Sequence, residues 1–244
     1  MKQLAFQLND TEPLVDIRAR LLPSFGPQRA LYRLDPVSQL VRAMLSSRTK
    51  DNVSAAAFAR LQERYESWDL LRSADPKEIK TLIHTVTHAE VKALYLPQAM
   101  RAIVARHGAL NLNFLADWDD EQAMRLLVLL PGVGPKIAAA VLNFSTLHKR
   151  ALVVDTHLLR IGKRLGLLPR HANYEDGYET YMSLVPDSWD ADDLFELHWL
   201  LKHHGQKTCT KLSPDCPNCP LRDLCRRCLH EDAEADDIEQ WQVK

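Results

Sequence analysis

Four cysteines near the carboxyl end of the chain have types and spacing suited to metal chemistry. The pattern is Cys-x6-Cys-x2-Cys-x5-Cys, formed by Cys209, Cys216, Cys219 and Cys225. Thiols crowded in this way indicate metal ligands in a reducing compartment, because the disulfides of a secreted protein would be spread along the chain. Four thiolates suit either a [4Fe–4S] cluster or a zinc ion. Cys228 lies outside the pattern and is expected to be a free thiol.

A second chemical feature is a glycine-containing turn followed by a lysine. It reads Leu130-Pro131-Gly132-Val133-Gly134-Pro135-Lys136. Two glycines one residue apart permit a tight turn and a close approach of the backbone to a ligand. The proline after them suits the first position of a helix. The turn would therefore present free amides and a helix N-terminus to an anion such as a phosphate, the alternative being an ordinary corner between helices.

The elements that must position these residues are helical nearly throughout. Helix starts with an acidic cap and a proline are predicted at Asp35-Pro36 and Asp75-Pro76. Helical patterns cover residues 14–21 (closed by Pro23), 36–45, 51–65, 76–83, 94–107 and 120–130. The apolar run at 152–154 is too isolated to form a sheet. We therefore expect an all-α protein with short polar loops.

Composition sets further bounds on the class of protein. With 244 residues, 46% of them hydrophobic, the chain can bury one large core or two small ones. The apolar runs are far shorter than the roughly 20 residues of a membrane span, and the start lacks a secretory signal. The net charge of −1 hides an acidic tail at 229–244, expected to be disordered, and a body with 30 basic against 26 acidic residues. That mild excess is compatible with a nucleic-acid-binding face without being evidence for one.

The turn before Lys136 resembles the helix-hairpin-helix of the endonuclease III family of DNA glycosylases. Asp155 comes 19 residues after Lys136, and its segment Val154-Asp155-Thr156-His157 resembles the family's segment with its essential aspartate. The resemblance covers roughly residues 35–228 and includes the cysteine spacing. It implies that Lys136 is the nucleophile, that Asp155 assists, and that the cysteines hold a structural [4Fe–4S] cluster.

The chemistry that the resemblance implies requires these residue types. Only an amine forms a Schiff base with the sugar carbon C1′, and a lysine with an ordinary pKa of about 10.4 is protonated at neutral pH. A helix N-terminus and partial burial both lower the pKa of Lys136. A carboxylate at Asp155 can accept a proton and stabilise positive charge on the sugar.

The implied substrate is double-stranded DNA with a damaged base, expected to be an oxidised pyrimidine, or with an abasic site. The nucleotide must leave the duplex before it can react. The implied activity is that of a bifunctional glycosylase and lyase, which nicks the strand by β-elimination. The hairpin residues expected to hold the DNA backbone are Leu130, Gly132, Val133 and Gly134.

Two segments depart from the family pattern where the damaged pair would be read. In the segment 46–51, Arg48 stands where relatives carry a glutamine that fills the space of the flipped base. Arg48 is expected either to take that place or to contact a phosphate. The segment Thr87–Val91 lacks the glycine and the wedging leucine of relatives, and His88 is the candidate substitute. The lesion preference of the relatives is therefore not transferred.

Basic residues flank the cysteine segment. Lys207 and Lys211 stand on either side of Cys209 and are candidates for contacts with DNA phosphates, the alternative being simple solvation. His203 and His204 are interpreted as packing or helix C-terminal residues, because four cysteines are available as ligands.

The resemblance also implies two helical domains. A central helical barrel is expected at 36–147, and a cluster domain is expected to combine 1–35 with 148–228. DNA would bind in a cleft between them, with Lys136 and Asp155 meeting across it. We expect a monomer without membrane association, in the cytoplasm and associated with a bacterial nucleoid.

Two alternatives remain at this point. Monofunctional adenine glycosylases share the hairpin and the cysteines, but they generally lack a lysine at the position of Lys136 and carry an extra C-terminal domain. A non-catalytic iron–sulfur DNA-binding protein is disfavoured by the intact Lys136 and Asp155, while Arg48 and the Thr87–Val91 segment leave it open.

Overall fold

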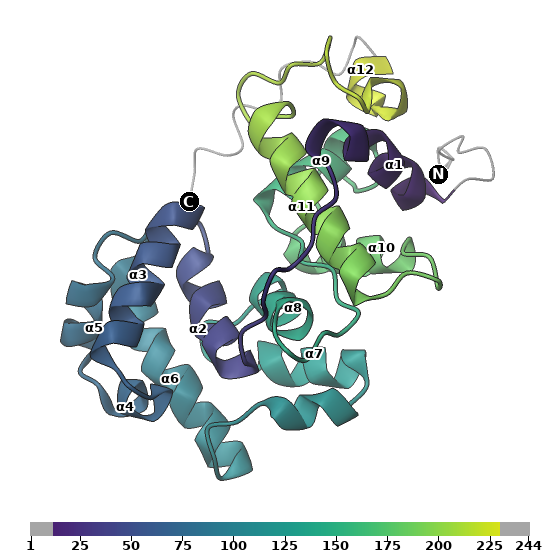
Figure 1. Cartoon of the computed structure of the whole chain (residues 1–244). Helices are drawn as coiled ribbons and strands as arrows, with labels where there is room; N and C mark the ends of the chain where they lie inside the picture. Colours follow the sequence, from purple (N-terminus) through teal and green to yellow (C-terminus); the bar gives the residue numbers. More distant parts are fainter. Residues whose placement is uncertain (1–11, 230–244) are drawn as a thin grey trace. The chain divides into compact units, whose positions relative to one another are not determined.

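The computed structural model describes residues 12–229, and within them the chain is helical (Figure 1). No strand forms in this part of the chain, where the only β-type pairing is an isolated bridge between Leu34 and Ser145. The predicted all-α class is therefore confirmed. The predicted acidic tail lies, apart from Leu229, outside the described residues. No helix in the described part is both long enough and apolar enough to cross a bilayer.

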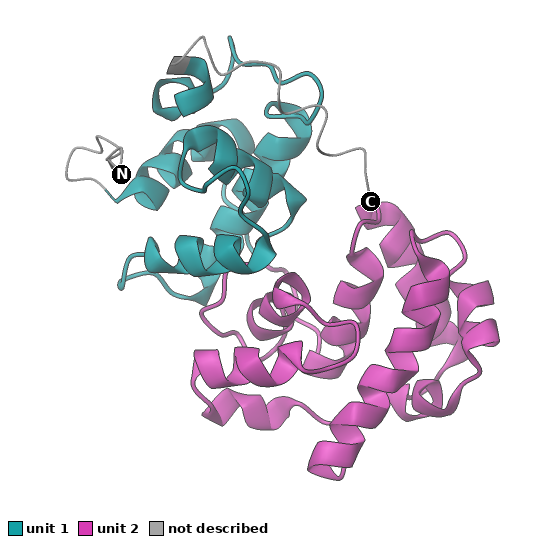
Figure 2. Ribbon diagram, turned by 180° about the vertical axis from the view of Figure 1, so that it is seen from behind, with its two compact units in different colours: residues 1–29, 154–244 teal, residues 30–153 magenta. Residues whose placement is uncertain are grey.

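The chain divides into two compact units, shown in separate colours in Figure 2. Unit 2 is continuous and covers residues 30–153, whereas unit 1 combines 1–29 with 154–244. The predicted divisions lie at 35/36 and 147/148. Residues 33–34 belong to unit 2 because Arg33 donates to the carbonyl of Asn143 at 2.6 Å and the Leu34 carbonyl accepts from Thr146 N at 2.9 Å.

Unit 2 contains eight helical elements. They are α2 (Pro36–Ser46), α3 (Asp51–Arg64), α4 (Trp68–Ser73), α5 (Pro76–Leu82), α6 (Ala89–His107), the 3-10 helix η1 (Asn113–Asp117), α7 (Asp120–Val128) and α8 (Pro135–Phe144). Helix α2 lies at the centre and packs against α3, α6 and α8. Its side chains at Leu40, Val41 and Leu45 are fully buried.

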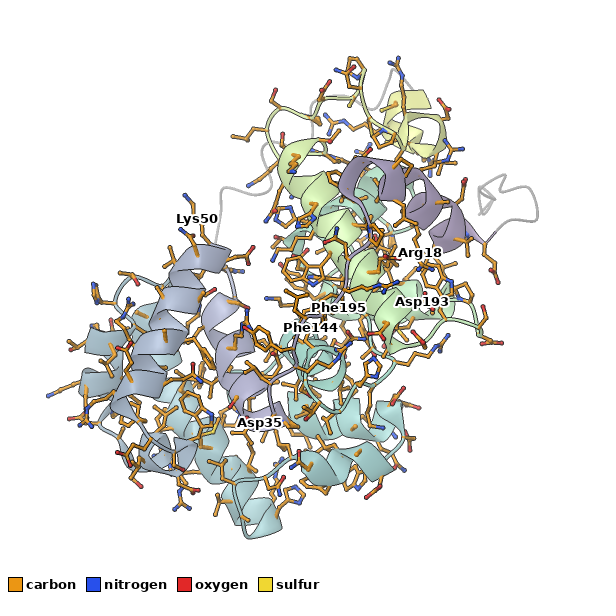
Figure 3. All side chains as sticks on the ribbon, in the orientation of Figure 1. Arg18, Asp35, Lys50, Phe144, Asp193 and Phe195 are labelled. Carbon is orange, nitrogen blue, oxygen red and sulfur yellow. The ribbon has the colours of Figure 1, made fainter. Side chains whose placement is uncertain are left out.

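The helix starts of unit 2 follow the predicted capping chemistry. Asp35 accepts from Val37 N and Ser38 N at 3.0 Å each, and Pro36 is the first residue of α2 (Figure 3). Asp75 likewise accepts from Lys77 N at 2.8 Å at the start of α5. These bonds satisfy amides that have no partner inside the helix.

Unit 1 contains α1 (Pro13–Phe25), α9 (Thr156–Leu165), α10 (Tyr174–Ser183), α11 (Ala191–Lys207), the 3-10 helix η2 (Arg222–Leu224) and α12 (Arg226–Leu229). Pro23 lies inside α1 and does not close it as predicted; the helix ends at Phe25, where Gly26 takes a φ of +69° and donates to the Leu22 carbonyl at 2.8 Å. Helix α11 packs against α1 and α9.

Ion pairs hold the N-terminal helix to α11. Arg18 lies 2.9 Å from Asp193, and both are labelled in Figure 3. Arg18 also lies 2.5 Å from Glu196. Glu196 is buried, and it also accepts from the backbone N–H of Gln28 at 3.1 Å. A buried carboxylate with charged and backbone donors is stable only while those donors stay in place. The N-terminal segment is therefore an integral part of unit 1.

Candidate active site and cysteine-lined cavity

The predicted hairpin lies between α7 and α8 in unit 2. Gly132 has a φ of +75°, and a Cβ built on it would lie 2.8 Å from the Cβ of Tyr95. Both the backbone conformation and the space require glycine there. The side chains of Leu130 and Val133 are buried, at 2% and 7% exposure. These two residues anchor the turn, so any anion contact that they make comes from their backbone.

Lys136 is the second residue of α8 and is half-buried. Its Nζ donates to the hydroxyl of Ser46 at 3.1 Å, and that hydroxyl donates to the Ala43 carbonyl at 2.9 Å. Ser46 is the last residue of α2. The amine is therefore held at the end of α2, beside the segment that carries Arg48.

The two segments that depart from the family pattern lie together in the structure. The backbone N–H of Thr87 donates to the Thr49 hydroxyl at 3.2 Å. Arg48 and His88 are both exposed, and both have left-handed backbone conformations, with φ of +53° and +57°. Such conformations are uncommon without glycine and occur mainly where the surroundings hold them.

Sequence reasoning missed one residue of this site, Lys92 on α6. Its side chain is buried, and its Nζ donates to the carbonyls of Leu45 and Ser47 at 2.7 Å and to the Thr49 hydroxyl at 3.1 Å. Burial, and then the nearby charge of Lys136, lower the pKa of Lys92 to about 8. A lysine in a helical pattern normally indicates a solvated face, so no signal in the sequence pointed to Lys92.

Asp155 is the N-cap of α9 in unit 1. Its Oδ1 accepts from His157 N at 2.8 Å and from Leu158 N at 3.1 Å. Burial raises the pKa of Asp155, but nearby His198 and His157, the Leu158 amide and Lys202 outweigh it and hold the pKa below its ordinary value. Asp155 is therefore an ionised carboxylate at neutral pH. Its meeting with Lys136 stays a prediction.

Helix α9 also supports the cysteine segment through two arginines. Arg160 donates to the carbonyl of Cys209 at 2.9 Å and to that of Gly205 at 2.8 Å. Arg164, which is buried, donates to the carbonyls of Thr210 at 2.6 Å and Lys211 at 3.0 Å. One helix therefore carries the carboxylate at its start and holds the cysteine segment along its side.

The four predicted cysteine ligands line one cavity in unit 1, together with Cys228 and Arg164. All five cysteines are thiols. Burial raises the pKa of Cys219 to about 11, and the sulfur of that residue lies 3.7 Å from Nε2 of His204. Within residues 12–229, no three His, Cys, Asp or Glu side chains are arranged closely enough to hold a single metal ion.

The remaining predicted residues near the cysteine segment are one cysteine, two lysines and two histidines. Cys228 lines the same cavity although it lies outside the sequence pattern, and its backbone N–H donates to the Cys225 carbonyl at 2.9 Å. Lys207 and Lys211 are exposed, and Nζ of Lys207 lies 5.6 Å from the ring centroid of Phe25. His203 and His204 both contact the Phe25 ring, in keeping with a packing role.

Together, the fold and these sites define an all-helical protein with a helix-hairpin-helix, a lysine directly behind the hairpin, and a thiol-lined loop. The description "HhH-GPD superfamily base excision DNA repair protein" matches residues 41–187. The chain belongs to this superfamily and, within it, to the endonuclease III family.

Relatives and solved structures agree with this assignment. The chain is 33% identical over 203 residues to Endonuclease III-like protein 1 of Gallus gallus, covering 83% of this chain and 66% of that protein. It is 30% identical over 189 residues to Endonuclease III of Sulfolobus acidocaldarius, covering 77% and 80%. The fold matches a trapped endonuclease III–DNA covalent intermediate with a TM-score of 0.73 at 24% identity, covering 90% and 97%. The chain thus spans slightly less than two thirds of the chicken relative.

Proposed function

We propose that the protein is a base-excision DNA glycosylase with lyase activity, in which the Lys136 amine is the nucleophile. The observation that carries this proposal is the position of Lys136, in the first turn of α8 directly behind the hairpin, with its Nζ on the Ser46 hydroxyl. A helix N-terminus disfavours an ammonium ion and therefore favours the reactive neutral amine. The names of the endonuclease III relatives support the same activity.

The proposed reaction uses an amine nucleophile and a carboxylate base. Nζ of Lys136 bonds to C1′ of an extruded nucleotide while the C1′–N bond breaks, and the base leaves with that electron pair and a proton. Opening of the sugar gives an iminium ion between Nζ and C1′. Loss of a C2′ proton then expels the 3′ phosphate and cuts the strand, and water releases the lysine. We assign to the ionised Asp155 the acceptance of a proton and the stabilisation of positive charge on the sugar.

The proposed cofactor is a [4Fe–4S] cluster held by Cys209, Cys216, Cys219 and Cys225. A zinc ion would need four sulfurs about 2.3 Å from one centre. The cysteine spacing has only one Cys-x2-Cys knuckle, where zinc ribbons usually have two, and it resembles the cluster loop of the endonuclease III family, so we propose the cluster for this thiol-lined cavity. When bound, the cluster would cross-link a loop that buries little apolar surface of its own.

The proposed partner is double-stranded DNA with a damaged base or an abasic site, bound by a monomer at the nucleoid in the cytoplasm. Gly132 of the hairpin is an exposed residue, and its backbone amide is our candidate for contact with a DNA phosphate. Arg48 and His88 lie on linked, exposed turns, and we assign to them the reading of the damaged pair, with an oxidised pyrimidine as one candidate lesion. Lys207 and Lys211 are exposed and suit phosphate contacts.

Borohydride trapping tests this proposal. Duplexes with an abasic site or an oxidised pyrimidine are incubated with the purified protein, and the imine is reduced to a stable adduct. We expect an adduct with the wild type and none with Lys136→Gln. The matched control is Lys80→Gln, which changes an exposed lysine in the same unit. Base release without an adduct would indicate a monofunctional glycosylase, and no adduct on any damaged duplex would overturn the lyase.

A further inference from the structure

The ammonium group of Lys92 is enclosed by oxygens from one short segment. Lys92 is 8% exposed, and its Nζ has three acceptors: the Leu45 and Ser47 carbonyls and the Thr49 hydroxyl. An ammonium group has three donors, so these contacts use all of them. Lysines are almost never buried unless they are paired in this way.

The acceptors belong to the C-terminal end of α2 and to the turn that follows it. The last carbonyls of a helix have no partner inside the helix, and they carry the negative end of its dipole. The ammonium group of Lys92, on α6, donates to the Leu45 and Ser47 carbonyls at this end of α2, although it lies 45 to 47 residues further along the chain. Lys92 therefore caps α2 from a neighbouring helix.

The turn that Lys92 fixes contains the contacts of the reactive amine. Ser46, which lies between two of the acceptors, receives the hydrogen bond from Lys136. Thr49, the third acceptor, also accepts from the backbone of Thr87 and so ties down the segment that carries His88. One buried ammonium thus holds the partner of the amine and both exposed turns.

The charge of Lys92 acts on the same amine. Lys136, on α8, is the charged group that lowers the pKa of Lys92, while the contacts from α2 and its turn come from uncharged oxygens. Glu90, on the first turn of α6, pairs with Lys80. Repulsion between like charges is mutual, so a positive Lys92 disfavours a proton on Lys136.

We propose that Lys92 is a positioning residue for the Lys136 amine, which fixes the Ser46–Thr49 turn and places a second positive charge beside the nucleophile. This inference rests on the proposed role of Lys136. A cationic neighbour is one of the means by which a lysine becomes nucleophilic at neutral pH.

The test is the single-turnover rate of borohydride trapping on an abasic duplex, measured from pH 6 to pH 10. Lys92→Met removes the charge and all three donors. We expect trapping to slow by about 100-fold, the loss that a misplacement of about 1 Å can cause, with the midpoint of the rate profile moved to higher pH. Lys92→Arg keeps a cation and its donors, and we expect it to restore the midpoint and most of the rate. Lys80→Met is the matched control.

The outcomes separate this inference from the lyase proposal. If wild-type protein forms no adduct at any pH, the lyase proposal fails. If the wild type reacts but Lys92→Met has the same rate and midpoint, only the role of Lys92 fails. An equal slowing of both Lys92 variants with an unchanged midpoint would also overturn it. If Lys92→Met does not fold, Thr49→Val and Lys92→Arg are measured in its place. Thr49→Val removes one of the three acceptors of Lys92, so we expect this variant to slow trapping at an unchanged midpoint.

Discussion

Replacing Asp155 by asparagine and by alanine should separate its structural role from its chemical one. The carboxylate caps α9 through two amides, at 2.8 and 3.1 Å. An asparagine oxygen can accept the same bonds, because Asn and Asp are equally good N-caps. It cannot serve as an anionic proton acceptor. Alanine loses both functions.

The magnitudes follow from the two capping bonds. Loss of an N-cap costs about 0.5–2 kcal/mol, and because two amides lose their acceptor we place Asp155→Ala at the upper end, about 2 kcal/mol. At about 2–4 °C per kcal/mol for a chain of this size, Tm should fall by about 4–8 °C. Asp155→Asn should lose only the charge–dipole contribution, about 0.3–1 kcal/mol. Its trapping rate should nevertheless fall by about 10²- to 10⁴-fold, the range for removal of a general base.

The assay combines thermal unfolding with single-turnover trapping on an abasic duplex. Asp190 offers a matched control in the same unit, because it caps α11 through two amides at the same distances, 2.8 and 3.1 Å. Asp190→Asn should leave the trapping rate unchanged. If Asp155→Asn traps at close to the wild-type rate, the chemical role is refuted. If it is as unstable as Asp155→Ala, the capping argument is refuted.

Three further predictions concern the hairpin, acid stability and the cysteine segment. In urea unfolding, Gly132→Ala should lower the free energy of unfolding by about 1–3 kcal/mol more than Gly108→Ala does. Both glycines have a positive φ, but of the two only Gly132 would place a new Cβ against Tyr95. Equal losses in the two variants would contradict this contact. The pKa of Asp155 is lowered on folding, so its stabilisation is present above the unfolded pKa and is lost as pH falls through the folded value. Urea unfolding from pH 6 to pH 2 should therefore show a shallower acid limb for Asp155→Asn, and an unchanged limb would count against the shift. Arg164→Met removes donors to two carbonyls of the cysteine segment and should lower retained iron by about 10- to 100-fold, measured by visible absorbance and iron content; full retention would show that the segment needs no such support.

Local chemistry made part of this structure predictable from the sequence. The Asp-Pro starts at Asp35 and Asp75 fix helix ends because capping involves only neighbouring residues. Lys136 at the start of α8 follows from the same kind of rule. Pro23 shows the limit of such rules, since α1 continues past it to Phe25.

The residues that could not be predicted act over long separations in the chain. Lys92 meets the end of α2 only after the helices have packed, and its sequence neighbours resemble any solvated helix face. Arg160 and Arg164 likewise find their carbonyl acceptors 45–49 residues away. Periodicity reports which face of a helix is apolar, but it does not report which buried cation meets which carbonyl.

The support that α9 gives to the cysteine segment has a consequence for biosynthesis. A ribosome adds about 5–20 residues per second. Helix α9 is therefore synthesised several seconds before the residues whose carbonyls accept hydrogen bonds from Arg160 and Arg164. Unit 2 is continuous and is fully translated by residue 153, so it can fold while translation proceeds. Unit 1 combines a segment made before unit 2 with segments made after it, so it closes only after unit 2 has been translated. An interrupted chain would thus carry a finished hairpin and Lys136 on a nascent protein whose Asp155-bearing unit is still open.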